Sequence, residues 1–169
     1  VPAEKVNEKS GQALTFLPVL FIIKSDDARV RDEFVKPIDH ESVSLKEGFW
    51  KRVRALNATV SLKNIYRRFE ETGRFDAIRC ERREKPPHIF YDSDVAKWLE
   101  AAAYLQADYP DQDVRAIIDE TVRTIVKNQL PCGYFNSFYQ VYQPDKIFME
   151  RTEHELYCAG HLIEAAVAL

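Results

Sequence analysis

The most regular feature of this sequence is a run of aliphatic residues that recurs every three to four positions. Its members are Val114, Ile117, Ile118, Val122, Ile125 and Val126. This spacing places them on one face of an α-helix and does not fit the two-residue alternation of a half-buried strand. Pro110 and Asp111 precede the run and Gly133 follows it, as is typical of a helix start and stop. We therefore predict an amphipathic helix between these positions.

Two earlier segments also show helical periodicity. One stripe consists of Phe49, Val53, Leu56 and Val60, and a second, out of phase with it, consists of Leu62, Ile65, Tyr66 and Phe69. We predict two helices separated at Thr59–Ser61, with Gly73 as the stop. The other helix is predicted from Asp92 onward, with Ser93 as its cap and Asp94 at its positive end. Its stripe is Val95, Trp98, Leu99, Ala102 and Leu105.

A last helix is predicted to begin at Thr152, which forms a capping-box pattern with Glu155. From His154 to Leu169 the only charged residues are Glu155 and Glu164. A helix with so few charges is expected to be buried on most sides. Together these segments predict an all-α fold of paired antiparallel helices that forms part of a layered helical barrel.

Residues before position 41 have a different character. Ala13–Ile23 is an uncharged, mostly apolar run of 11 residues flanked by charged residues. A secretory signal or a stray strand would each account for this run, and no clear cleavage site follows it. We divide the chain into an unassigned segment, 1–40, and a helical part, 41–169. At the start of the second part, Val43–Leu45 alternates in polarity and predicts one short strand.

Charge and cysteine content exclude several classes of protein. The net charge of −3 gives no positive field for nucleic acid. The apolar run is also too short to span a membrane, which takes about 20 residues. Cys80, Cys132 and Cys158 form no C-x-x-C pair, so no structural zinc site is predicted. His154 and Cys158 lie one turn apart but are too few to hold a metal.

His154 is the first candidate for a role in binding. The capping box would make it the second residue of the last helix, where the positive helix end disfavours a charged imidazolium. A neutral imidazole can donate to and accept from the hydroxyl groups of a ligand. The structural alternative is a histidine that only hydrogen-bonds the neighbouring loop. His161, further along the helix, is interpreted as a buried structural residue.

Two further candidates precede the helix predicted from residue 92. Phe90 could offer an apolar ring face to a sugar, or it could be part of the core. Asp92 could bind a sugar hydroxyl or extend the helix cap. The aromatic loop at 133–142 has the same two interpretations, sugar stacking or packing under a neighbouring loop.

Several segments, in the same order along the chain, resemble the β-L-arabinofuranosidases of glycoside hydrolase family 127. They are Gly48–Arg52, Glu71–Phe75, Tyr91–Tyr104, Gly133–Asn136 and His154–Ala168. The resemblance implies a catalytic domain built as an (α/α)6 barrel, followed by β-sandwich domains, one of which would pair with the strand near Val43–Leu45. Because the chain starts at Val1 and ends within an apolar helical pattern, we expect it to be the N-terminal part of such a protein.

The resemblance also implies a reaction. Enzymes of this family release terminal L-arabinofuranose with retention, using a cysteine nucleophile at a zinc site of Cys and Glu ligands and a separate Glu as acid/base. None of these groups corresponds to Cys132 or Cys158, so no catalytic or metal-binding residue is assigned here and the isolated chain is expected to be inactive. Substrate-contacting positions do correspond: His154 and Phe90, and with a weaker match Asp92.

Two other functions remain open at this point. A helical binding or scaffold module without chemistry would explain the same helical pattern. A sugar epimerase on a similar helical barrel would need several histidines at the barrel mouth, where only His154 is well placed.

Overall fold

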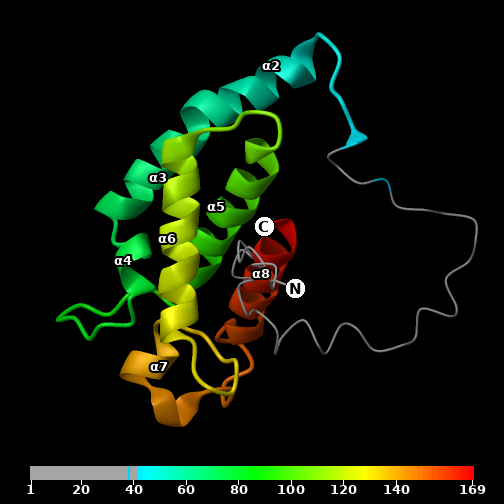
Figure 1. Cartoon of the computed structure of the whole chain (residues 1–169). Coiled ribbons are helices and arrows are strands. Elements are labelled where there is room, and N and C mark those ends of the chain that lie inside the picture. Colours follow the sequence, from blue (N-terminus) through cyan, green and yellow to red (C-terminus); the bar gives the residue numbers. More distant parts are fainter. Residues whose placement is uncertain (1–37, 39–41) are drawn as a thin grey trace, which may run out of the picture.

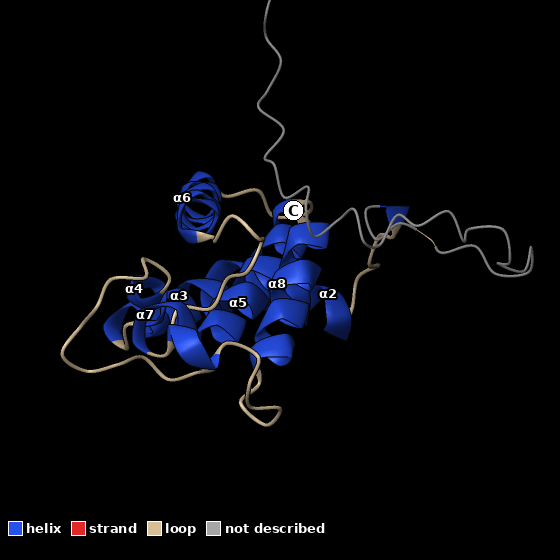
Figure 2. Ribbon diagram, turned by 90° about the horizontal axis from the view of Figure 1, so that it is seen from below, coloured by secondary structure: helices blue, strands red, loops and turns tan. Residues whose placement is uncertain are grey.

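The structure is a computed structural model that describes residue 38 and residues 42–169. The apolar run Ala13–Ile23 and the division after residue 40 lie outside these described residues. Among the described residues every regular element is a helix, which confirms the predicted all-α class (Figure 2). No helix in this part of the chain combines the length and the apolar character that crossing a bilayer would require.

The first predicted helix pair is one continuous rod (Figure 1). Helix α2 (Phe49–Leu56) runs through a π-helical turn, η3 (Asn57–Ser61), into α3 (Leu62–Glu71). The predicted break is therefore wrong. The wider π-helical turn takes up the phase shift between the two apolar stripes without interrupting the helix. Gly73, in the left-handed conformation with φ 78°, ends the rod as predicted.

The predicted strand is absent: residues 43–46 have no regular structure, and none of the described residues pairs with them. A strand needs the hydrogen bonds of a neighbour to form. The apolar stripe of α2 is largely uncovered by the described residues, since Phe49 and Leu56 are 62% and 53% exposed. One side of α2 lines a groove with α5 that includes Trp50, Val53 and Tyr104.

A short helix, α4 (Arg74–Ala77), follows Gly73. Helix α5 (Tyr91–Gln106) follows and is antiparallel to α3, since Arg54 near the start of the rod reaches Tyr104 and Arg74 near its end reaches Asp94. Trp98 joins the two helices: its indole N–H donates to the carbonyl of Leu62 at 3.0 Å.

Helix α6 (Gln112–Asn128) confirms the aliphatic periodicity, because Val114, Ile118, Val122 and Ile125 are all buried. The Asp111 carboxylate caps this helix by accepting from two backbone N–H groups in its first turn. Helices α5 and α6 form an antiparallel hairpin, which agrees with the predicted pairing.

The remaining elements are α7 (Tyr139–Tyr142), η4 (Pro144–Lys146) and α8 (Glu155–Ala168). Helix α8 packs along α5, the most extensive helix–helix contact among the described residues (Figures 1 and 2). It is less buried than predicted, since Leu156 and Val167 are 74% and 67% exposed. We call the interface between α5 and α8 the α5–α8 seam. Contacts at both of its ends, described below, show that the two helices run in the same direction.

Candidate functional site

The first residues of α5 and α8 meet at one end of the molecule. Phe90 is the N-cap residue of α5, and His154 is the N-cap residue of α8. Neither side chain makes a capping hydrogen bond. Both rings are therefore free for other contacts, next to two helix ends that carry partial positive charge.

Three aromatic side chains gather at this end, and we call Phe90, His154 and Tyr157 the ring cluster. The imidazole of His154 meets Phe90 edge-to-face with ring centroids 4.7 Å apart. Tyr157 completes the cluster at 5.9 Å from His154 and 6.3 Å from Phe90. His154 is exposed, Phe90 half-buried and Tyr157 44% exposed, so the cluster is open to a ligand.

The ring cluster also carries polar groups. The ammonium of Lys97, on α5, donates to the Tyr157 hydroxyl at 2.7 Å and lies 4.8 Å from the centre of the Tyr157 ring. Aromatic faces pack against apolar C–H surfaces, while imidazole, phenol and ammonium groups hydrogen-bond hydroxyls. This combination suits a ligand with one apolar face and several hydroxyl groups.

The predicted capping box at Thr152 is wrong. Helix α8 begins at Glu155, and His154 adopts a left-handed conformation with φ 61°. The carboxylate of Glu155 instead accepts from the Tyr134 hydroxyl and from the backbone N–H of Phe148 at 2.8 Å. Since these loop donors occupy the carboxylate, it does not reach back to Thr152, and His154 stands one step before the helix rather than at its second position.

Asp92 is 1% exposed, and its side chain lies in the first turn of α5. One carboxylate oxygen accepts from the backbone N–H of Ser137 at 2.8 Å. Burial raises the pKa of this carboxyl to about 6, although the hydrogen bonding to Ser137 opposes the shift. Asp92 thus holds the aromatic loop against α5. Ser93 is not the cap that was predicted, because its hydroxyl donates to the Phe90 carbonyl at 2.8 Å.

The aromatic loop at 133–142 mainly packs against the rest of the chain. Phe135 and Tyr139 are 7% and 1% exposed. The Tyr142 hydroxyl accepts from the backbone N–H of Arg83 at 2.8 Å, which joins this loop to the one before α5. Of the two interpretations considered, packing under a neighbouring loop fits these residues.

Comparison with known proteins identifies the family of this chain. A family model described as the β-L-arabinofuranosidase, GH127 catalytic domain, matches residues 42–169. The chain belongs to the GH127 family. That match covers both helices of the site and the loop between α6 and α8.

Individual GH127 relatives are similar to parts of this chain. A non-reducing end β-L-arabinofuranosidase of Bifidobacterium longum is 42% identical over 85 residues, 47% of this chain and 13% of that protein. A crystal structure of a GH127 β-L-arabinofuranosidase from Geobacillus stearothermophilus T6 superposes with a TM-score of 0.70 at 36% identity, covering 74% of this chain and 22% of the other. A second GH127 β-arabinofuranosidase gives 0.67 at 29% identity, covering 78% and 23%. The chain thus spans less than a quarter of each.

The cysteines of this chain do not fit the zinc site of Cys and Glu ligands that the GH127 resemblance implies. Burial is the main reason that the pKa of Cys80 rises to about 12 and that of Cys158 to about 11, so neither thiol is a ready metal ligand. Cys132 is exposed. No cysteine belongs to a group of three close metal-ligating side chains in the described part of the chain, and we derive no step through zinc here.

Two members of this candidate site were not found from the sequence. Tyr157 lies three residues after His154, so helical spacing alone would have placed it near His154. Lys97 carried no such signal, because only the packing of α8 on α5 brings it to Tyr157.

Proposed function

We propose that this chain is part of a glycoside hydrolase that acts on β-L-arabinofuranosides, and that the ring cluster contributes to binding the terminal sugar. Membership of GH127 and the names of the relatives support the glycosidase class. The observation that carries the proposal is the open ring cluster at the shared ends of α5 and α8, with His154 and Phe90 in direct contact.

The finer points of the proposal come from the resemblance. They are an (α/α)6 barrel completed outside this chain, β-sandwich domains beyond it, exo-acting cleavage with retention, and a zinc-bound cysteine nucleophile that is not one of the three cysteines here. The parallel run of α5 and α8, with antiparallel α3 and α6 beside α5, is compatible with such a barrel.

In this proposal each residue of the ring cluster has its own role. Phe90 packs its exposed ring surface against C–H groups of the furanose, and His154 exchanges hydrogen bonds with a sugar hydroxyl. The Tyr157 phenol, held by Lys97, offers a further hydrogen-bonding group. For Asp92 the burial supports an indirect role: it positions the aromatic loop rather than touching the sugar.

The test uses substitutions of His154 in the complete protein. Left-handed backbone is tolerated by Asn and Gly but strained for Ala, so His154→Asn and His154→Gly remove the imidazole with little backbone cost. We expect both to lower kcat/KM on an aryl β-L-arabinofuranoside by more than about tenfold, the equivalent of about one lost hydrogen bond. Their unfolding midpoints should stay close to that of the unsubstituted protein.

His154→Ala is the matched control for backbone strain. It should lower kcat/KM as much as His154→Asn does and should also lower stability. Unchanged kcat/KM in all three variants would remove His154 from the site. An unsubstituted protein that hydrolyses no β-L-arabinofuranoside would overturn the proposed function itself.

A further inference from the structure

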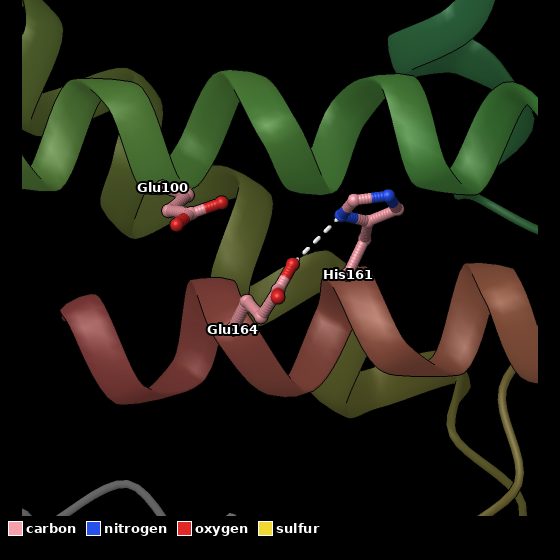
Figure 3. Close-up of side chains that lie close together, drawn as sticks. All are labelled: Glu100, His161 and Glu164. Carbon is pink, nitrogen blue, oxygen red and sulfur yellow. Dashed lines mark ion pairs between the residues drawn. The ribbon is translucent and has the colours of Figure 1, made fainter.

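A second group of polar side chains lies along the α5–α8 seam, further from the helix starts than the ring cluster. Glu100 comes from α5, and His161 and Glu164 come from α8 (Figure 3). Their nearest nitrogen and oxygen atoms all lie within 4.8 Å of one another. We call these three residues the seam triad.

The two residues on α8 are three positions apart, so they share one face of the helix. The His161 Nδ1 atom lies 2.9 Å from a Glu164 carboxylate oxygen. That nitrogen is buried, yet the contact lacks the geometry of a hydrogen bond. The ring nitrogen and the carboxylate oxygen therefore lie close together without forming a hydrogen bond. Two ligands of one metal ion have the same relationship.

The charges of the seam triad also favour a bound cation. Within residues 42–169 no Lys or Arg forms an ion pair with Glu100 or Glu164. Lys97, one turn before Glu100, donates to Tyr157 instead. Two neighbouring carboxylates in a half-buried seam repel each other, and a bound cation would relieve this repulsion.

The imidazole is also oriented from outside the triad. The Tyr157 ring meets the His161 ring edge-to-face, with centroids 4.6 Å apart. Metal-binding imidazoles are usually oriented by a hydrogen bond from the ring nitrogen that does not bind the metal, and here the Tyr157 ring restricts the imidazole instead. Metal-binding helical bundles also combine a carboxylate and an imidazole three residues apart on one helix with carboxylates from other helices, there in the order Glu-x-x-His, whereas here the histidine comes first.

We propose that Glu100, His161 and Glu164 form a binding site for a divalent transition-metal cation that ties α5 to α8. One imidazole and two carboxylates suit Mn²⁺, Fe²⁺ or Zn²⁺. Neighbouring ligand atoms on one such ion lie about 3.0–3.6 Å apart, so the side-chain ends of the triad would move together by about 1 Å on binding. The ligand set contains no thiolate, unlike the Cys and Glu set that the GH127 resemblance implies, and the proposal is independent of the proposed glycosidase function.

The test counts bound Mn²⁺ in the complete protein after treatment with a chelator. Mn²⁺ is a suitable probe because thiolates favour softer ions. Electron paramagnetic resonance of the free ion should show that the unsubstituted protein binds one more equivalent of Mn²⁺ than His161→Gln or Glu164→Gln, and Zn²⁺ should displace it. Loss of one ligand should weaken this binding by more than about tenfold.

Two variants distinguish loss of the metal site from a general loss of folding. The Glu164 side chain is 59% exposed, so Glu164→Gln should fold normally. Glu70→Gln, on the exposed surface of α3, is the matched control and should bind Mn²⁺ as the unsubstituted protein does. Added Zn²⁺ should also raise the thermal midpoint more in the unsubstituted protein than in Glu164→Gln. The proposal would be overturned if the unsubstituted protein and both triad variants bound equal numbers of Mn²⁺ and Zn²⁺ ions with equal affinity.

Discussion

Phe90 and His154 occupy the same position on two parallel helices: each is the N-cap residue, and their rings meet edge-to-face at an interplanar angle of 86°. Neither ring caps its own helix. Each ring instead restricts the orientation of the other. Removal of one side chain would therefore let the other ring adopt more orientations.

This contact predicts energetic coupling between the two residues. In the complete protein, Phe90→Leu keeps apolar bulk but removes the aromatic edge-to-face contact. Combined with His154→Asn, it should give a double-mutant coupling in kcat/KM of about 0.5–1.5 kcal/mol, the range found for aromatic pairs. Strictly additive effects would show that the two rings act separately.

Asp92 predicts a change of stability with pH. In the folded protein the pKa of its carboxyl is about 6, compared with about 3.9 in an unfolded chain. Between these pH values the folded state holds a proton that the unfolded state has released, so stability falls as pH rises from about 4 to about 6. A difference of about two pKa units corresponds to roughly 3 kcal/mol.

Asp92→Asn should remove this part of the pH dependence, because the amide oxygen can still accept from Ser137 without a charge. Urea unfolding at several pH values measures the difference between the two proteins. We expect Asp92→Asn to gain stability relative to the unsubstituted protein as pH rises from about 4 to about 6. Parallel stability curves would show that Asp92 does not titrate in this range.

The buried hydrogen bonds of Glu155 predict a loss of stability when its carboxylate is removed. The Glu155 side chain is 6% exposed and accepts from Tyr134 and Phe148. Glu155→Ala leaves both donors without a partner and should lower the free energy of unfolding by about 1–3 kcal/mol. Glu155→Gln should cost less, since its amide oxygen can still accept. Glu120→Ala, at an exposed ion pair on α6, is the control and should change stability by less than about 1 kcal/mol.

Cys158 and Cys132 are expected to differ in their reactivity toward a thiol reagent. Cys158 is buried, its thiol donates to the Ile89 carbonyl at 3.4 Å, and burial raises its pKa to about 11. Because the thiolate is the reactive form, Cys158→Ser should leave the number of fast-reacting thiols in the native protein unchanged. Cys132→Ser should lower that number by one, since Cys132 is exposed. Fast labelling of Cys158 in the native protein would contradict this description of the α5–α8 seam.

Much of the helical framework could be predicted from the sequence. The aliphatic stripe of α6 and the stripe of α5 around Trp98 are regular enough to identify both the helices and their buried faces. Gly73 ends its helix as predicted, because it supplies the left-handed conformation that other residues avoid. These elements depend on local spacing and local backbone preference.

The helix starts near the site could not be predicted in the same way. Ser93 and Thr152 both match local capping patterns, but tertiary contacts decide where α5 and α8 begin. Glu155 accepts from Tyr134 and from Phe148 in the loop before α8, and His154 adopts a left-handed conformation that sequence patterns do not favour. The candidate residues were found, while their positions relative to the helices depended on contacts between distant segments.

The π-helical turn at Asn57–Ser61 sets how this chain tolerates changes of length. Because a π-helical turn holds one residue more than an α-helical turn, deleting one residue there would restore an ordinary α-helix and leave α2 nearly in phase with α3. Trp50 and Val53 would then still face Tyr104 across the groove they share. A one-residue insertion or deletion in the α-helical parts of the rod would instead turn α2 by about 100° and change the surface that α2 offers to its neighbours.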